Sequence, residues 1–315
     1  MRVHAFALCL FAALAAAGNP AAFAQGAAVP APPPVVSASP SWWQAVRVSA
    51  SAAGARVENI SRTSDSATRR DATTYEAVLA AAHHRQLNRV WSLTTAADLT
   101  VFREPDFDRN EFTAVAGRLT VQRKAGLGPL APVIQWETAL LRHQADYVSN
   151  RGTTLESAVR FNRRLSSSLR ASVSAQWREH FARASTFDTH QRGAALSGTW
   201  DFADRWSLLA SVLHARGRFL THAGPASWSR ALGGAQGPEV ARIYASIPRE
   251  VTGLYGPNWI TYRPSARVTT GSASLLFAFS DQVSAEAQFS VTSLTDEADV
   301  HYPTRSLTLR LACRF

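Results

Sequence analysis

The sequence lacks several features that would assign it to a common class of protein. Beyond the N-terminus, no run of 18 apolar residues occurs without a charge, which excludes a bundle of transmembrane helices. The chain has only two cysteines, and Cys9 lies in an N-terminal apolar run that we expect to be removed. The mature protein then keeps Cys313 alone, so we expect no intrachain disulfide.

Motifs for metals, cofactors and nucleic acids are also missing. The sequence has no CxxC, no HExxH, no glycine-rich phosphate loop and no acidic calcium loop, so it predicts no cofactor and no metal. His83 and His84 are adjacent, and adjacent strand residues point to opposite faces, so they do not suggest a metal site. The basic residues are scattered over alternate positions rather than clustered, which argues against nucleic acid as a partner.

Lysine is almost absent, although the chain is basic. Lys124 is the only lysine among 33 basic residues. Loss of an N-terminal segment that includes Arg2 leaves 32 basic against 23 acidic residues, a net charge of +9. A GC-rich codon bias accounts for part of the preference for arginine, but not for the net excess. Such an excess indicates anionic partners, either the phosphates of outer-membrane lipopolysaccharide or acidic solutes.

The N-terminus has the features of a secretory signal peptide, which we place at residues 1–24. It carries Arg2, an apolar run over residues 5–17, and the small residues Ala22 and Ala24 before a cut at Gln25. Residues 25–41 are rich in proline and alanine and predict an extended periplasmic linker. The folded domain is expected over residues 42–315.

What this domain does contain is period-two alternation, the pattern of strands with one apolar face. In the last strand Leu307, Leu309, Leu311 and Phe315 alternate with mostly polar residues, and about ten such residues span a bilayer when tilted. Eleven further segments precede it. The twelve expected segments cover residues 42–52, 73–84, 90–102, 112–122, 133–148, 155–165, 168–181, 194–202, 206–219, 267–279, 283–293 and 305–315.

The connections between these segments alternate between tight turns and longer loops. With an even number of strands, all tight turns and both termini fall at one end, as in outer-membrane barrels. We therefore predict an all-β fold, a closed antiparallel up-and-down transmembrane barrel of about twelve strands, in which Phe315 closes against residues 42–52. Segment 133–148 is irregular and suggests a bulge. A long extracellular loop is expected at about 221–265, and its five aromatic residues fit either a constriction inside the barrel or a cap on its surface.

The signal peptide, the hairpins and the alternating last strand ending in Phe315 resemble bacterial outer-membrane β-barrel proteins. The resemblance is to a porin-like class, not to one family. It implies localisation in the cell outer membrane, and it implies that Leu307, Leu309, Leu311 and Phe315 form the C-terminal signal that the barrel-assembly machinery reads.

The polar face of the strands carries charged residues that we predict to line a pore. These residues are Arg47, Asp98, Arg118, Arg160, Arg170, Arg178 and Glu286. One interpretation is an arginine-lined path for small anionic solutes or acidic saccharides. The other is that acids and bases pair across the interior and hold the barrel rigid.

We predict a porin-like channel rather than an enzyme. An exopolysaccharide export or secretion barrel is the alternative. A lipid-modifying hydrolase is a third reading, because phospholipase barrels of this size use a histidine and a serine two residues apart on the lipid face. None of the nine histidines has serine at the second following position, and His143 with Ser149 has the wrong spacing.

Overall fold

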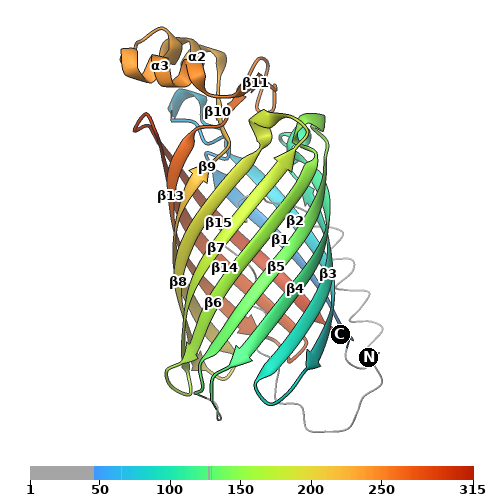
Figure 1. The fold of residues 1–315 in the computed structure, drawn as a ribbon. Helices are drawn as coiled ribbons and strands as arrows, with labels where there is room; N and C mark the ends of the chain where they lie inside the picture. The colour runs from blue at the N-terminus through green and yellow to red at the C-terminus, as the bar shows by residue number, and fades with distance from the viewer. Residues whose placement is uncertain (1–45, 65, 127, 129) are drawn as a thin grey trace.

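The protein is a closed antiparallel β-barrel of twelve strands, as the sequence predicts (Figure 1). The computed structural model describes residues 46–64, 66–126, 128 and 130–315. The predicted signal peptide, the linker and the first residues of the expected domain lie outside this part of the chain.

Twelve long strands form the barrel wall, and strands that follow one another along the chain are neighbours in it. The wall is closed by β1 and β15, where Ser49 lies opposite Arg314 and the Phe315 backbone N–H donates to the Val48 carbonyl at 2.8 Å. The predicted closure is therefore confirmed. The wall strands are β1 (Val46–Glu58), β2 (Ala72–Gln86), β3 (Trp91–Arg103), β4 (Phe112–Lys124), β5 (Val133–Ala145), β6 (Gly152–Arg164), β7 (Leu169–Ala182), β8 (Thr189–Ala203), β9 (Trp206–Arg218), β13 (Ser265–Ala278), β14 (Val283–Asp296) and β15 (His301–Arg314).

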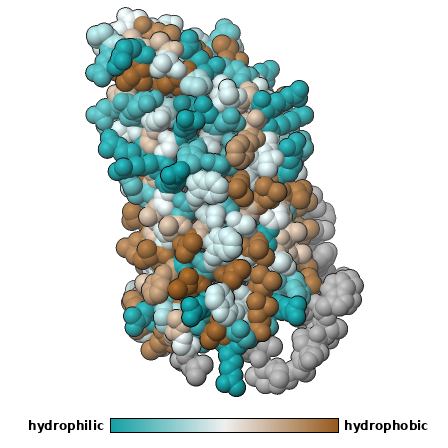
Figure 2. Space-filling model, viewed as in Figure 1, coloured by the Kyte–Doolittle hydropathy of each residue, from teal (hydrophilic) through white to brown (hydrophobic). Residues whose placement is uncertain are grey.

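The alternation in sequence becomes two faces of the wall. Large apolar side chains stay exposed on the outer face, for example Leu140 at 58% and Leu309 at 61%. Figure 2 shows hydrophobic residues mainly over the lower part of the visible wall and hydrophilic residues around its upper part. The opposite parity carries the charged and small residues inside the barrel. An outward apolar belt of this kind is what a lipid environment requires.

The two ends of the barrel differ in their connections. At one end of the barrel the turns after β2, β6, β8 and β13 have two to four residues and the turn after β4 has eight. The C-terminus lies at this turn end (Figure 1). The other end, the loop end, carries the two longest connections, β1–β2 and β9–β13, while its other four have four to eight residues. The longest connection joins β9 to β13 and contains β10 (Thr221–Ala223), α2 (Pro225–Leu232), α3 (Pro238–Ser246), β11 (Arg249–Val251) and β12 (Ile260–Tyr262). No helix in the described ranges is long and apolar enough to cross a membrane.

Several details of the predicted strands are wrong: β8 begins at Thr189 instead of Ala194, and β15 begins at His301 instead of Arg305. β1 continues to Glu58 instead of ending at Ala52. Ala55 and Val57 face inward and pack there against apolar loop residues, so the expected contrast between an apolar outer face and a polar inner face is lost. β5 has no bulge, since it pairs without a register shift with both β4 and β6. The one shift in the described wall lies between β8 and β9, at residues 201–203.

Candidate functional site

A chain of alternating charges crosses the inner face of four neighbouring strands. Arg118 on β4 donates from Nε and Nη2 to Asp98 Oδ2 on β3, at 3.1 and 3.0 Å, and from Nη1 to Glu137 Oε1 on β5 at 2.9 Å. Arg160 on β6 places Nη1 3.8 Å from Glu137 Oε2. One guanidinium thus serves two carboxylates, a geometry that its planar fork of donors allows.

A second charged bridge reaches across an entire strand. Arg310 on β15 lies 3.8 Å from Glu76 on β2 and 3.6 Å from Glu286 on β14. Between Arg310 and Glu76 lies Ala53 of β1, whose register partners are these same two residues. Because alanine is short, the guanidinium can reach over it to the carboxylate on the far side.

Two further pairs continue the charged contacts on the inner face from β6 to β9. Arg178 Nε lies 3.3 Å from Glu156 Oε1, which joins β7 to β6. Arg170 donates to both oxygens of Asp201 at 3.0 and 3.1 Å, and the hydroxyl of Ser207 donates to Asp201 Oδ1 at 2.7 Å. These contacts join β7 to β8 and β9.

Six of the seven predicted pore residues take part in these pairs. Arg47 faces inward near the turn end and has no ion pair within the described part of the chain. The pairing across the interior, which the sequence left open, is what the structure shows. A role for these residues in a solute pathway stays a prediction. Glu137 and Arg310 were missed, because the first lies in the segment read as bulged and the second acquires its role only from the register around Ala53.

Basic residues without a carboxylate partner gather at inward-facing positions near the turn end. Four inward-facing positions there have no acidic group within 4.0 Å among the described residues, namely Arg47, Lys124, Arg164 and Arg314. Arg164 lies directly opposite the paired Arg170. The turn end of the interior therefore carries the unpaired positive charge of the inner face, among the described residues.

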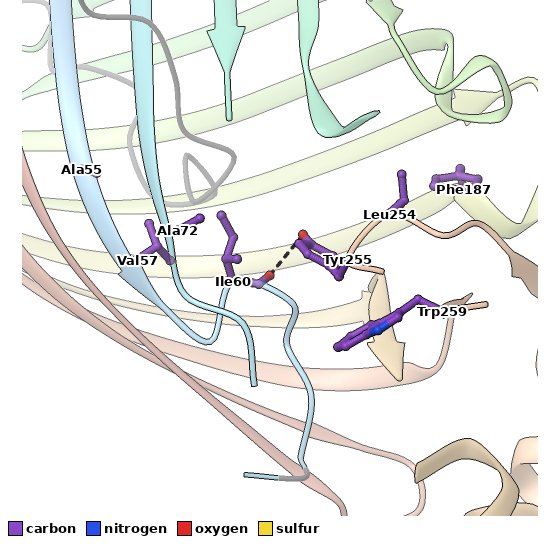
Figure 3. Packing of buried hydrophobic residues seen from close by; sticks show 8 residues of the cluster. All are labelled: Ala55, Val57, Ile60, Ala72, Phe187, Leu254, Tyr255 and Trp259. Atoms are coloured by element: carbon purple, nitrogen blue, oxygen red, sulfur yellow. Dashed lines mark hydrogen bonds between the residues drawn. The ribbon is translucent and has the colours of Figure 1, made fainter. Parts of the chain in front are cut away.

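The loop end is closed by the segment between β11 and β12, residues 252–259, which we call the hairpin tip. Its side chains Leu254, Tyr255 and Trp259 are buried at 6%, 6% and 4% exposure. They pack with five wall and loop residues, Ala55, Val57, Ile60, Ala72 and Phe187 (Figure 3). Phe107 and Tyr147, from two other loops, pack against the same cluster. The hairpin tip thus contacts residues from around the circumference of the barrel mouth.

Polar contacts tie the hairpin tip and β11 to several loops. Arg109 Nη1 donates to the Thr252 carbonyl at 3.0 Å, and the Tyr255 hydroxyl donates to the Ile60 carbonyl at 3.4 Å. On β11, Glu250 Oε1 accepts from the Tyr147 hydroxyl at 2.5 Å and from the Ser149 hydroxyl at 2.9 Å. Burial and the adjacent Glu250 carboxylate raise the pKa of Tyr147 to about 12, so its proton stays in this bond.

Two buried titratable groups lie beside Tyr255. Glu104 is fully buried, and neither of its carboxylate oxygens has a hydrogen-bond partner among the described residues. Burial, with the nearby Asp106 and Glu111, raises the pKa of Glu104 to about 8. His222 stacks edge-on against Tyr255 at 4.8 Å between ring centroids, and burial together with the Arg62 guanidinium lowers the pKa of His222 to about 3. The mouth is therefore closed around a neutral histidine and a carboxyl group that is easily protonated.

The other aromatic residues of the long connection form a cap beside the mouth. Trp228, Tyr244 and Tyr262 pack together, with Trp228 and Tyr244 stacked at 5.6 Å. The hydroxyls of Tyr244 and Tyr302 both donate to Asp296 Oδ2, at 2.8 and 2.7 Å, which fixes α3 to the loop ends of β14 and β15. Both expected arrangements of the aromatics thus occur, a plug made by Tyr255 and Trp259 and a cap made by the others.

The histidine considered for a hydrolase faces the barrel interior. The centroid of the His143 ring lies 5.3 Å from that of His180 and 5.5 Å from that of Phe112. His143 is on the inner face of the wall, opposite the exposed apolar belt. His180 Nδ1 contacts the hydroxyl of Thr154 at 2.8 Å. On the outer face, His214 contacts Thr269 and His301 contacts Thr295.

The residues of the predicted assembly signal lie on the outer face of β15. Leu307, Leu309 and Phe315 are exposed at 53%, 61% and 41%, while Leu311 is half-buried. Their recognition by the assembly machinery stays a prediction.

The fold and the two faces of the wall define a barrel of the bacterial outer-membrane type, with a paired charged interior and a plugged mouth. Comparison with solved structures agrees with this class. An outer membrane channel from Pseudomonas putida F1 superposes with a TM-score of 0.56 at 10% identity, covering 86% of this chain and 96% of that one. The NanC porin superposes with a TM-score of 0.44 at 8% identity, covering 84% and 98%. No protein-family model matches the chain, and no curated protein sequence matches it.

Proposed function

We propose that this protein is an outer-membrane channel for small, preferentially anionic solutes or acidic saccharides, exported through a cleaved signal peptide. The observation that carries the proposal is the division of the wall into an apolar outer belt and a charged inner face that has unpaired bases near the turn end. The fold shared with an outer membrane channel supports it.

The anion preference follows from which charges remain uncompensated. Carboxylates on the inner face, such as Asp98, Glu137 and Asp201, each lie within 4 Å of an arginine. Arg47, Lys124, Arg164 and Arg314 have no such partner in the described part of the chain, and they lie toward the periplasmic opening that the topology implies. Unpaired guanidinium and ammonium groups around an opening attract anions and repel cations.

The test is conductance in a planar bilayer with a gradient of potassium chloride. The full-length protein and a variant with residues 252–259 replaced by a glycine-serine linker are measured side by side, because the hairpin tip fills the mouth. We expect a low conductance for the native protein, a higher one for the variant, and a reversal potential of the anion-selective sign. Absence of conductance in both proteins would refute the channel, and cation selectivity would refute the anion preference.

A further inference from the structure

A row of arginines crosses three neighbouring strands on the outer face of the wall. Arg192 on β8 lies directly opposite Arg216 on β9, and Arg216 lies directly opposite Arg267 on β13. Arg218 occupies the next outward position on β9. All four side chains are exposed. Opposite residues of adjacent strands have Cβ atoms only about 5 Å apart, so these charges are close neighbours.

The arginine row has no acidic partner of its own. None of the four has a carboxylate within 4.0 Å among the described residues, although every arginine of the inner charge chain has one. The acids on the adjoining elements are already engaged. Glu179 lies 2.6 Å from His190, and Glu297 accepts from the Ser265 backbone N–H.

A fifth arginine increases the positive charge next to the row. Arg263 donates to the Asp188 carbonyl at 2.6 Å, and burial together with the Arg218 charge lowers the pKa of Arg263. Like charges placed directly opposite on neighbouring strands destabilise a sheet. The repeated juxtaposition therefore indicates an anion that binds between these side chains.

The row begins where the apolar belt ends. On β9 Val212 is exposed at 54%, and Arg216 is the second outward residue beyond it toward the loops. On β8 Leu196 is exposed at 59%, and Arg192 is again the second outward residue beyond it. Two outward steps along a strand correspond to about 13 Å along its axis, less when the strand is tilted. The arginines therefore lie at the level of lipid headgroups if the belt lies in hydrocarbon.

We propose that the arginine row is a binding site for the phosphates of lipopolysaccharide, the phosphorylated glycolipid of the outer leaflet. The proposal rests on the proposed function only in that the loop end faces outward. A guanidinium binds phosphate through two parallel hydrogen bonds, and the belt below offers apolar surface to the acyl chains of the same molecule. An amphiphile satisfies both surfaces, whereas a free anion would satisfy only one.

The test compares the folded full-length protein with a variant in which Arg192, Arg216 and Arg267 are all changed to glutamine. Purified lipopolysaccharide is titrated into each protein in neutral detergent, with dephosphorylated lipopolysaccharide and inorganic phosphate as separate probes. Arg142→Gln is the control, because Arg142 is exposed on the outer face of β5 at the first outward position beyond Leu140 toward the loops but lies outside the row.

We expect the triple variant to bind lipopolysaccharide about tenfold more weakly or worse, since several charge-assisted hydrogen bonds are lost. The control should bind lipopolysaccharide as tightly as the native protein does. The native protein should bind dephosphorylated lipopolysaccharide only as weakly as the triple variant binds intact lipopolysaccharide. Equal binding by native protein and triple variant, or an equal loss in the control, would overturn the proposal. Inorganic phosphate that competes at the same concentration as the lipid would also overturn it, because the site would then recognise a free anion.

Folding of the triple variant is checked independently by its heat-modifiable gel mobility and by its thermal unfolding without lipid. Because the substitutions relieve repulsion, we expect the lipid-free unfolding temperature to stay the same or rise. A fall would mean that the row stabilises the barrel without a ligand, against the proposal. Lipid binding does not depend on conductance, so a failed channel experiment and a failed lipid experiment remain distinguishable.

Discussion

The contact that decides whether solute can enter from the loop end is the packing of Tyr255 in the barrel mouth. Its ring is 6% exposed and lies 4.9 Å from the Phe107 ring, 4.8 Å from the His222 ring and 5.7 Å from the Trp259 ring. The change to consider is Tyr255→Ala, which removes all three ring contacts and the hydroxyl bond to the Ile60 carbonyl.

The magnitude follows from the burial. Truncating a buried aromatic side chain to alanine costs about 3–5 kcal/mol. The wall strands are held by their own backbone ladders, so this loss falls on the docking of the hairpin tip rather than on the barrel. Each 1.4 kcal/mol is a factor of about ten, so the ratio of docked to undocked tip should fall by about two to three and a half powers of ten.

The assay is the conductance of native and Tyr255→Ala protein in planar bilayers, with Trp228→Ala as the control. Trp228 is 5% exposed, so its truncation removes comparable aromatic packing, but it lies in the cap cluster and not in the hairpin tip. We expect Tyr255→Ala to raise the open fraction and Trp228→Ala to leave it near the native level. Unchanged conductance in a folded Tyr255→Ala protein, or the same increase in both variants, would refute the reasoning.

Three further outcomes are expected. The pKa of Glu104 is raised to about 8 in the closed mouth, against 4.5 for an exposed glutamate, so the closed mouth is most stable below about pH 4.5 and loses this stabilisation as the pH rises toward 8. Conductance should therefore rise with pH in the native protein, and the conductance of Glu104→Gln should not depend on pH in this range. Arg118→Gln leaves two carboxylates without their shared guanidinium, so it should lower the free energy of urea unfolding by about 2 kcal/mol and shift the reversal potential toward cation selectivity. An unchanged reversal potential would show that Arg118 does not lie on the ion pathway. Phe315→Ala should change the free energy of unfolding of the refolded barrel by under about 1 kcal/mol, because Phe315 is 41% exposed. It should nevertheless lower the fraction of folded, heat-modifiable protein recovered from membranes, and an equal fraction in the variant and the native protein would contradict the assembly role.

The wall could be predicted from the sequence because alternation is a local property. In β7 every second residue from Leu169 to Trp177 is apolar, and the turn at Ser166 is short. The strand, its apolar face and the hairpin can therefore all be predicted from a few neighbouring residues. The sequence predicts the end of β1 six residues too early, because a run rich in alanine shows little difference in polarity between its two faces. Where contrast fails, the neighbouring strand and the hairpin tip decide the boundary.

The candidate site was less predictable, because its contacts depend on register and on the path of the long connection. Arg310 and Glu76 are far apart in sequence and meet only because Ala53 lies between them. The helices α2 and α3 did have a local indication, a proline at the start of each preceded by glycine at positions 224 and 237. Nothing local distinguishes Tyr255, which plugs the mouth, from Tyr244, which belongs to the cap.

The excess of positive charge, which the sequence alone linked to either lipid phosphates or acidic solutes, has two separate locations in the fold. Inside the wall most arginines are neutralised by carboxylates, so the interior charge chain contributes little net field, and the unpaired bases lie near the turn end. Outside the wall, four arginines without a carboxylate partner among the described residues form one row at the loop end, above the apolar belt. Because the wall separates these two sets, their partners need not be the same molecule. A variant in the row should change lipid binding without changing ion selectivity, and a variant such as Arg164→Gln should do the reverse.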